Sequence, residues 1–157
     1  MHNPQACQLV GLIACSLIIA MKETTLIEEI KNKLVPILEE EGLEIVLLFG
    51  SAASGRMHKR SDIDLAFLYK KPVNILSLTN RVIRLLHMDS VDVVDLRHAS
   101  PLLRYSVAKN GRLLYERGEG MFNGFYSLAF RRYLDTKKLR DAQRIGIAQY
   151  LKERGLL

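Results

Sequence analysis

The sequence of 157 residues contains little cysteine, and it has no low-complexity segment or internal repeat. Its two cysteines, Cys7 and Cys15, both lie near the N-terminus. Neither their number nor their spacing is typical of a disulfide framework or a zinc site. A cytoplasmic location, where thiols stay reduced, is therefore expected. The length predicts one domain with a substantial hydrophobic core.

Long hydrophobic runs are also missing. The apolar stretch at residues 9–21 is 13 residues long and includes a glycine and a serine, whereas a membrane-spanning helix needs about 20 residues. A secretory signal would begin with positive charge, and His2 is the only candidate cation before this stretch. We therefore expect no membrane partner, and we interpret residues 1–20 as an extension that precedes the true start at Met21.

Positive charge is distributed unevenly along the chain, whose net charge is +6. Residues 1–49 carry a net charge of −4, residues 50–96 carry +2, and residues 97–157 carry +8. This asymmetry suggests an acidic partner, an anionic ligand or RNA at the C-terminal part. A basic helix face exposed to solvent explains it equally well.

Alternating strand and helix patterns predict an α/β (α+β) fold, with a small mixed sheet of three to four strands flanked by helices. The expected strands are residues 44–49, 62–69 and 91–96, with a short extended piece at 112–115. The expected helices begin at Thr25, Ile75, Pro101 and Phe122. Pro36 should kink or restart the first helix. The last, residues 122–154, is one long basic helix or two, with Gly146 as a weak point.

The strand pattern also suggests how the chain is divided. We expect residues 21–117 to form the main domain. Residues 118–157 begin with a linker that contains Gly118 and Gly120, and they continue as the basic helical segment. We expect this segment to pack on the domain or on a partner.

One stretch carries most of the functional information. Gly50 and Ser51 follow an apolar strand and are separated by ten residues from Asp62, Ile63 and Asp64. Two residues apart on a strand, the carboxylates project from the same face, with Cα atoms roughly 7 Å apart. Like charges on an otherwise apolar strand are costly unless a cation neutralises them. The pair therefore indicates divalent ions spaced about 3.5–4 Å apart, as in phosphoryl chemistry.

Two aspartates in the third expected strand compete to be a third carboxylate. Asp92 and Asp95 are three residues apart, so they point to opposite faces of a regular strand and only one can face the metal site. The alternation of side chains along the strand does not by itself tell which of the two aspartates faces the site.

The loop after Gly50 nearly matches a P-loop, since Gly55, Arg56 and Met57 follow at the corresponding places. A P-loop needs Lys and Ser or Thr where this chain has Arg56 and Met57. Because methionine cannot bind magnesium, we reject that mechanism. The basic residues of this loop either neutralise a bound triphosphate or face solvent, and Ser61 is expected to close the loop through a hydrogen bond to the backbone.

Together, Gly50-Ser51 and Asp62-Ile63-Asp64 resemble the signature of the nucleotidyltransferase superfamily that includes DNA polymerase beta and kanamycin nucleotidyltransferase. The resemblance covers residues 26–115 and is strongest to the minimal nucleotidyltransferases encoded beside HEPN-domain proteins. It implies the nucleotidyltransferase fold and the transfer of AMP from ATP to a hydroxyl acceptor with two Mg²⁺ ions. The metal and catalytic residues it implies are Asp62, Asp64 and Asp92, which it favours over Asp95. The nucleotide-binding residues are expected to be Gly50, Ser51, Arg56, Lys59 and Ser61.

The resemblance also implies the partner. Minimal nucleotidyltransferases of this kind act as antitoxins that add AMP to a tyrosine of a HEPN-family toxin, so we expect a hetero-oligomer with such a toxin and no nucleic-acid partner. Two alternatives stay open: a non-catalytic subunit that binds nucleotide or masks a toxin, and a nucleotidyltransferase that modifies an antibiotic. Arg81 and His87 vaguely resemble the Arg and His pair of HEPN ribonucleases. Those enzymes are all-helical, however, and this chain has strands.

Overall fold

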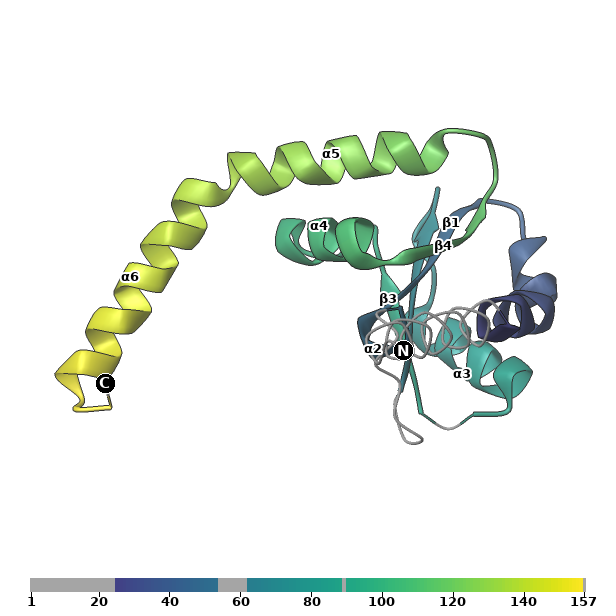
Figure 1. Ribbon diagram of the computed structural model, residues 1–157, viewed down its shortest axis with the longest axis horizontal. Coiled ribbons are helices and arrows are strands. Elements are labelled where there is room, and N and C mark those ends of the chain that lie inside the picture. The colour runs from purple at the N-terminus through teal and green to yellow at the C-terminus, as the bar shows by residue number, and fades with distance from the viewer. Residues whose placement is uncertain (1–24, 54–61, 89, 157) are drawn as a thin grey trace, which may run out of the picture.

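A four-stranded mixed sheet forms the centre of the computed structural model, which describes residues 25–53, 62–88 and 90–156 (Figure 1). The strand order is β3-β2-β1-β4. Strand β1 pairs antiparallel with both β2 and β4, and β2 pairs parallel with β3. The strands are β1 (Leu43–Phe49), β2 (Ile63–Tyr69), β3 (Val91–Asp95) and β4 (Arg112–Glu116). The expected mixed sheet flanked by helices is confirmed.

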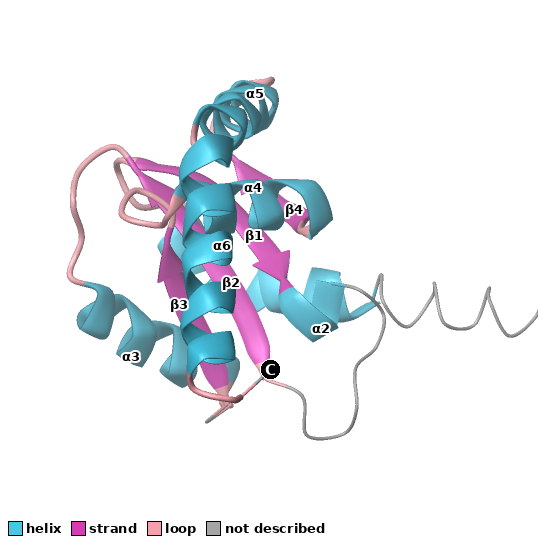
Figure 2. Cartoon of the chain, turned by 90° about the vertical axis from the view of Figure 1, so that its left-hand side faces the viewer, coloured by secondary structure: helices cyan, strands magenta, loops and turns pink. Residues whose placement is uncertain are grey.

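Helices cover both faces of the sheet. The described helices are residues 25–38, α2 (Gly50–Ala53), α3 (Ile75–Leu86), α4 (Pro101–Asn110), α5 (Met121–Asp135) and α6 (Lys137–Glu153). The first helix and α3 pack on one face through side chains such as Leu34 and Val82. Helices α4 and α5 pack on the other face through Val107, Phe125 and Ala129 (Figures 1 and 2). None of the helices in the described ranges is both long and apolar enough to cross a membrane.

Strand β2 is buried on both faces because helices lie on either side of it. Its Ile63, Leu65 and Phe67 point into the core beneath the first helix and α3, and Ala66 points into the core beneath α4 and α5. The near-continuous apolar run in this segment is what a central strand requires. Asp64 lies on the α4 and α5 side of this strand, two residues before Ala66.

Helix α3 connects β2 to β3, since parallel strands need a crossover connection. It begins at an N-cap, Asn74, whose side chain accepts a hydrogen bond of 3.0 Å from the Ser77 amide. It ends at His87, which has the left-handed φ of 55°. The crossover sets β3 beside β2, with Ile63 opposite Val91 and Asp64 opposite Asp92.

Three local features differ from the sequence prediction. The chain turns directly from β1 into the short helix α2 at Gly50, where a loop was expected. The first helix continues through Pro36 without restarting and ends two residues later. The C-terminal segment breaks at Thr136, while Gly146 lies inside α6. The Thr136 hydroxyl donates to the carbonyl oxygens of Arg132 and Tyr133 at 2.9 and 3.2 Å, a side-chain interaction that often bends helices.

Candidate active site

Asp64 and Asp92 lie side by side on neighbouring strands. They are direct partners in the parallel register of β2 and β3, and strands paired in this way are about 4.8 Å apart. Residues opposite each other in register project from the same face of a sheet. The two carboxylates therefore share the sheet face that α4 and α5 cover further along.

Asp62 adds a third carboxylate to this edge of the sheet. It is exposed and lies one residue before β2, two residues from Asp64. Burial raises the pKa of the Asp64 carboxyl above its ordinary value, and the negative charges of Asp92 and Asp62 raise that pKa further. Three carboxylates thus accumulate negative charge at one place, and a bound cation would relieve their repulsion.

Gly50 lies directly against the Asp64 carboxylate. The last residue of β1, Phe49, is paired with Asp64, and Gly50 follows it with a left-handed φ of +70°. A Cβ atom built on Gly50 would lie 1.9 Å from Asp64 Oδ2. Only glycine fits this position, both for its backbone angle and for its contact. The structure thus brings together two residues that the sequence motif had linked across fourteen positions.

Ser51 follows in the first turn of α2 and is half-buried. A residue that the sequence analysis did not single out, Arg112 at the start of β4, donates a hydrogen bond from Nε to the Ala53 carbonyl at 3.4 Å. Arg112 is also the register partner of Leu48, so it ties β4 to the turn that carries Gly50. No local motif marks this arginine, and only the pairing of β1 with β4 reveals its place.

Asp95 lies on the opposite face of β3 from Asp92, since its register partner is the core residue Phe67. Its Oδ1 accepts a hydrogen bond of 2.8 Å from the Arg97 amide, and its Oδ2 lies 2.6 Å from His98 Nδ1. This carboxylate therefore holds the turn that follows β3. Of the two alternatives for the third carboxylate, the geometry favours Asp92.

The donor chemistry of Asp62, Asp64 and Asp92 fits magnesium when a nucleotide supplies further oxygens. Within residues 25–53, 62–88 and 90–156, no three His, Cys, Asp or Glu side chains are grouped so that they could hold a metal ion. Magnesium in nucleotide enzymes is usually bound by one or two carboxylates together with phosphate oxygens and waters. As register partners, Asp64 and Asp92 match the one or two carboxylates that such a nucleotide-dependent site uses.

Three of the expected nucleotide-binding residues lie outside the described residues: Arg56, Lys59 and Ser61. Their roles remain predictions. The same holds for residues 1–20, including both cysteines.

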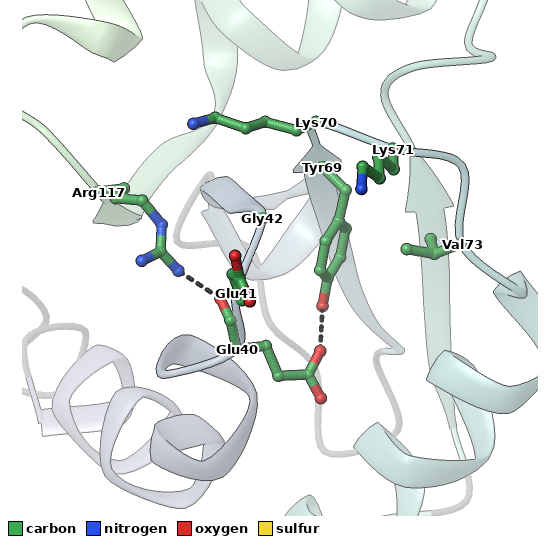
Figure 3. Close-up of a pocket in the computed structure, with 8 residues that line it drawn as sticks. All are labelled: Glu40, Glu41, Gly42, Tyr69, Lys70, Lys71, Val73 and Arg117. Atoms are coloured by element: carbon green, nitrogen blue, oxygen red, sulfur yellow. Dashed lines mark hydrogen bonds between the residues drawn. The ribbon is translucent and has the colours of Figure 1, made fainter.

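A pocket of about 420 Å³ lies at the opposite end of the sheet and contains none of the predicted site residues. It is lined by Glu40, Glu41, Gly42, Tyr69, Lys70, Lys71, Val73 and Arg117 (Figure 3). Figure 3 shows the Tyr69 hydroxyl directed at Glu40, which it contacts at 2.8 Å. Five residues of strand, roughly 17 Å, separate Tyr69 from Asp64. The pocket is therefore distinct from the carboxylate site.

Comparison with known sequences identifies a family for most of this domain. The family model described as Polymerase beta, Nucleotidyltransferase matches residues 32–120, which include Gly50, Asp64 and Asp92. The chain is 28% identical over 126 residues to the protein adenylyltransferase MntA of Aphanizomenon flos-aquae, covering 73% of this chain and 84% of that protein. It is 34% identical over 90 residues to the protein adenylyltransferase MntA of Shewanella oneidensis, covering 54% of this chain and 64% of that protein.

Solved structures share the same fold. A toxin–antitoxin crystal structure with AMP-PNP superimposes with a TM-score of 0.68 at 28% identity, covering 75% of this chain and 98% of that one. A structure of an MNT antitoxin with the tri-AMPylated HEPN toxin of Shewanella oneidensis gives a TM-score of 0.65, covering 78% of this chain and 98% of that one. The identity in the second case is 24%, so this likeness shows the fold alone.

Proposed function

Because the chain belongs to the polymerase beta nucleotidyltransferase family, we propose that it is an adenylyltransferase that moves AMP from ATP to a hydroxyl group of a partner protein. The observation that carries this proposal is the carboxylate site, where Asp64 is the register partner of Asp92 and packs against Gly50. The names of the two MntA relatives support adenylyl transfer to a protein. The AMP-PNP in a toxin–antitoxin structure of the same fold supports ATP as the donor.

In the proposed reaction, the acceptor oxygen attacks the α-phosphorus of ATP, the bond between the α-phosphorus and the bridging oxygen breaks, and pyrophosphate leaves. Asp62, Asp64 and Asp92 would hold Mg²⁺, which when bound neutralises triphosphate charge as it builds up on the leaving group. Asp92 would accept the proton of the acceptor hydroxyl. Gly50 lets the backbone approach the phosphates closely, and Ser51 offers a hydroxyl donor to their oxygens. The acceleration then comes mostly from alignment and charge stabilisation.

The proposed acceptor is a tyrosine of a HEPN-family toxin, which makes this chain the antitoxin of a toxin–antitoxin pair acting in the cytoplasm. The toxin–antitoxin structure at 28% identity supports the assembly. The resemblance of the Gly50-Ser51 and Asp62-x-Asp64 motif to the HEPN-linked minimal nucleotidyltransferases supports the class of partner.

The proposal is tested by incubating the purified chain with α-labelled ATP, Mg²⁺ and the HEPN-family protein encoded beside it. We expect label on a tyrosine of that protein, located by mass spectrometry, and no label when EDTA removes the metal. Nucleotide binding without transfer would instead support the non-catalytic alternative. Transfer to an aminoglycoside but not to the protein would support antibiotic modification.

Asp92 and Asp95 are expected to respond in opposite ways to replacement by alanine. Asp92→Ala should lower the transfer rate at least about a hundredfold, because a positioned base typically contributes that much, and should leave the fold intact. Asp95→Ala should keep the transfer rate of the folded protein. It should cost about 1–2 kcal/mol of unfolding free energy, since the Arg97 amide and His98 lose their acceptor.

The measurements are urea unfolding and initial rates of labelling at saturating ATP for both variants. A loss of transfer in folded Asp95→Ala with normal transfer in Asp92→Ala would reverse the assignment of the third carboxylate.

A further inference from the structure

Helix α6 has no buried residue, although its sequence is amphipathic. Figure 1 shows it continuing from the end of α5 and pointing away from the sheet. Leu139, Ile147 and Tyr150 are 61%, 60% and 51% exposed, and at 3.6 residues per turn they fall within about 80° of one another around the helix. Helices in proteins are stabilised mainly by burying such an apolar face. In the described part of the chain, nothing buries this one.

A cluster of aromatic rings lies on the surface next to the start of this helix. The Tyr105 ring of α4 is 4.4 Å from the Tyr133 ring, 5.6 Å from Phe130 and 6.5 Å from Tyr126, measured between ring centroids. Phe130 is 41% exposed and Tyr126 is 36% exposed. Tyrosine and arginine side chains at a surface are typical of the residues that dominate protein–protein binding energy.

The geometry favours a protein over a nucleic acid as the occupant of this surface. Single-stranded nucleic acids bind by stacking bases on open aromatic faces. The Tyr133 ring is already covered by Tyr105, which stacks on it with an interplanar angle of 21°, and by the Arg140 guanidinium, 3.8 Å from its centroid. The exposed aliphatic side chains Leu139 and Ile147 offer nothing that a base or phosphate would recognise.

The charge of this region specifies the kind of protein. Residues 121–157 contain eight Lys or Arg and three Asp or Glu, a net charge of +5. Within α6, Asp141 is paired with Lys137 at 2.5 Å and lies 3.9 Å from Arg144, so the remaining cations dominate its surroundings. A complementary partner is acidic around an apolar centre. The same region of a second copy carries the same charge, which disfavours pairing between two such helices.

We propose that α6 and the aromatic cluster (Tyr105, Tyr126, Phe130 and Tyr133) form a docking surface for an acidic face of the protein that receives AMP. This inference rests on the proposed function and adds to it a partner site separate from the carboxylates. Docking energy that does not change between ground state and transition state lowers KM for the partner and leaves kcat unchanged.

The test is the double variant Leu139→Ser/Arg144→Glu, with Leu76→Ser/Arg84→Glu on α3 as its matched control. Both pairs remove one exposed leucine and reverse one exposed arginine, but α3 packs on the sheet through its other face whereas α6 has no buried residue. The α6 variant should raise KM for the neighbouring HEPN-family protein at least tenfold, with kcat, the ATP KM and the melting temperature unchanged. The α3 control should match the wild type in all four quantities.

Failure of the docking inference and failure of the proposed function give different results. If the wild type labels the partner and the α6 variant does so with an unchanged KM, the docking surface is wrong while the function stands. A wild type that labels no protein removes the proposed function itself. A wild-type dimer in light scattering that the α6 variant loses, or RNA binding that it loses, would assign the surface to a second copy or to RNA and overturn the proposal.

Discussion

Replacing Asp64 by asparagine is expected to abolish adenylyl transfer while the protein stays folded and becomes slightly more stable. Asp64 is the central carboxylate of the site, between Asp62 on its own strand segment and its register partner Asp92. In the proposed reaction Asp64 helps bind Mg²⁺, so its loss should remove several kcal/mol of transition-state stabilisation, which corresponds to a loss in rate of roughly 10³–10⁴-fold. The effect should be the largest of any single conservative substitution in this chain.

The gain in stability has a separate cause. Burial and the negative charges of Asp92 and Asp62 raise the pKa of Asp64, so its charged form is less favourable in the folded protein than in the unfolded chain. At neutral pH and without metal, a neutral asparagine of nearly the same shape removes that penalty. The melting temperature of Asp64→Asn in EDTA should therefore equal or exceed that of the wild type.

Asp135→Asn, at the exposed end of α5, is the matched control, and it should change neither the rate nor the melting temperature. Labelling with Mg²⁺ and thermal unfolding in EDTA measure the two effects separately. Near-normal transfer by Asp64→Asn with Mg²⁺ would refute the assigned role of this carboxylate. A clear loss of stability in EDTA would show that the carboxylate is structural.

Replacing Gly50 by alanine is expected to lower both stability and transfer strongly. The left-handed φ of +70° costs a residue with a side chain about 1–2 kcal/mol. In addition, the new Cβ would lie 1.9 Å from Asp64 Oδ2, so the carboxylate or the turn must move. Overpacking of this kind typically costs a further 1–3 kcal/mol or so. Transfer should fall at least about a hundredfold, because a displacement of about 1 Å at a reacting centre has an effect of this size.

Gly42 offers a matched control, since it has a φ of +88° and no atom within 4 Å of a built Cβ. Gly42→Ala should show the cost of the backbone angle alone and retain transfer. A double-mutant cycle completes the test: in an Asp64→Ala background, Gly50→Ala should cost no more stability than Gly42→Ala does. Equal destabilisation by Gly50→Ala with and without the Asp64 side chain would contradict the contact.

Several elements could be read from the sequence because their signals are local. Helix α3 (Ile75–Leu86) begins and ends where its periodicity predicted, and β2 (Ile63–Tyr69) begins one residue later than expected. The sequence motif placed Gly50 and Asp64 in one candidate site, and the pairing of β1 with β2 puts them in contact. The glycine that follows β1 and the acid in β2 are a fixed number of residues apart, so the motif that contains them can be found in the sequence alone.

Other features left no such signal. The helix break lies at Thr136, whose hydroxyl bonds the preceding turn, whereas glycine propensity had pointed to Gly146. The position of Arg112 next to the turn that carries Gly50 depends on the pairing of β4 with β1, which no local sequence pattern predicts. The sequence also did not predict that α6 is exposed. An amphipathic pattern is the same whether the apolar face packs on its own domain or on another protein.

The sequence by itself predicted which residues make up the candidate site: a Gly-Ser turn after an apolar strand, followed by two acids two residues apart on the next strand. Only the tertiary structure decided which third acid joins them. Asp92 and Asp95 are three residues apart, so they lie on opposite faces of β3 and only one of them can face the site. No local sequence pattern tells which of the two it is. The parallel register of β2 with β3 put Asp92 beside Asp64. A one-residue slip would turn the core-facing side chains of β3, such as Val91, to the other face.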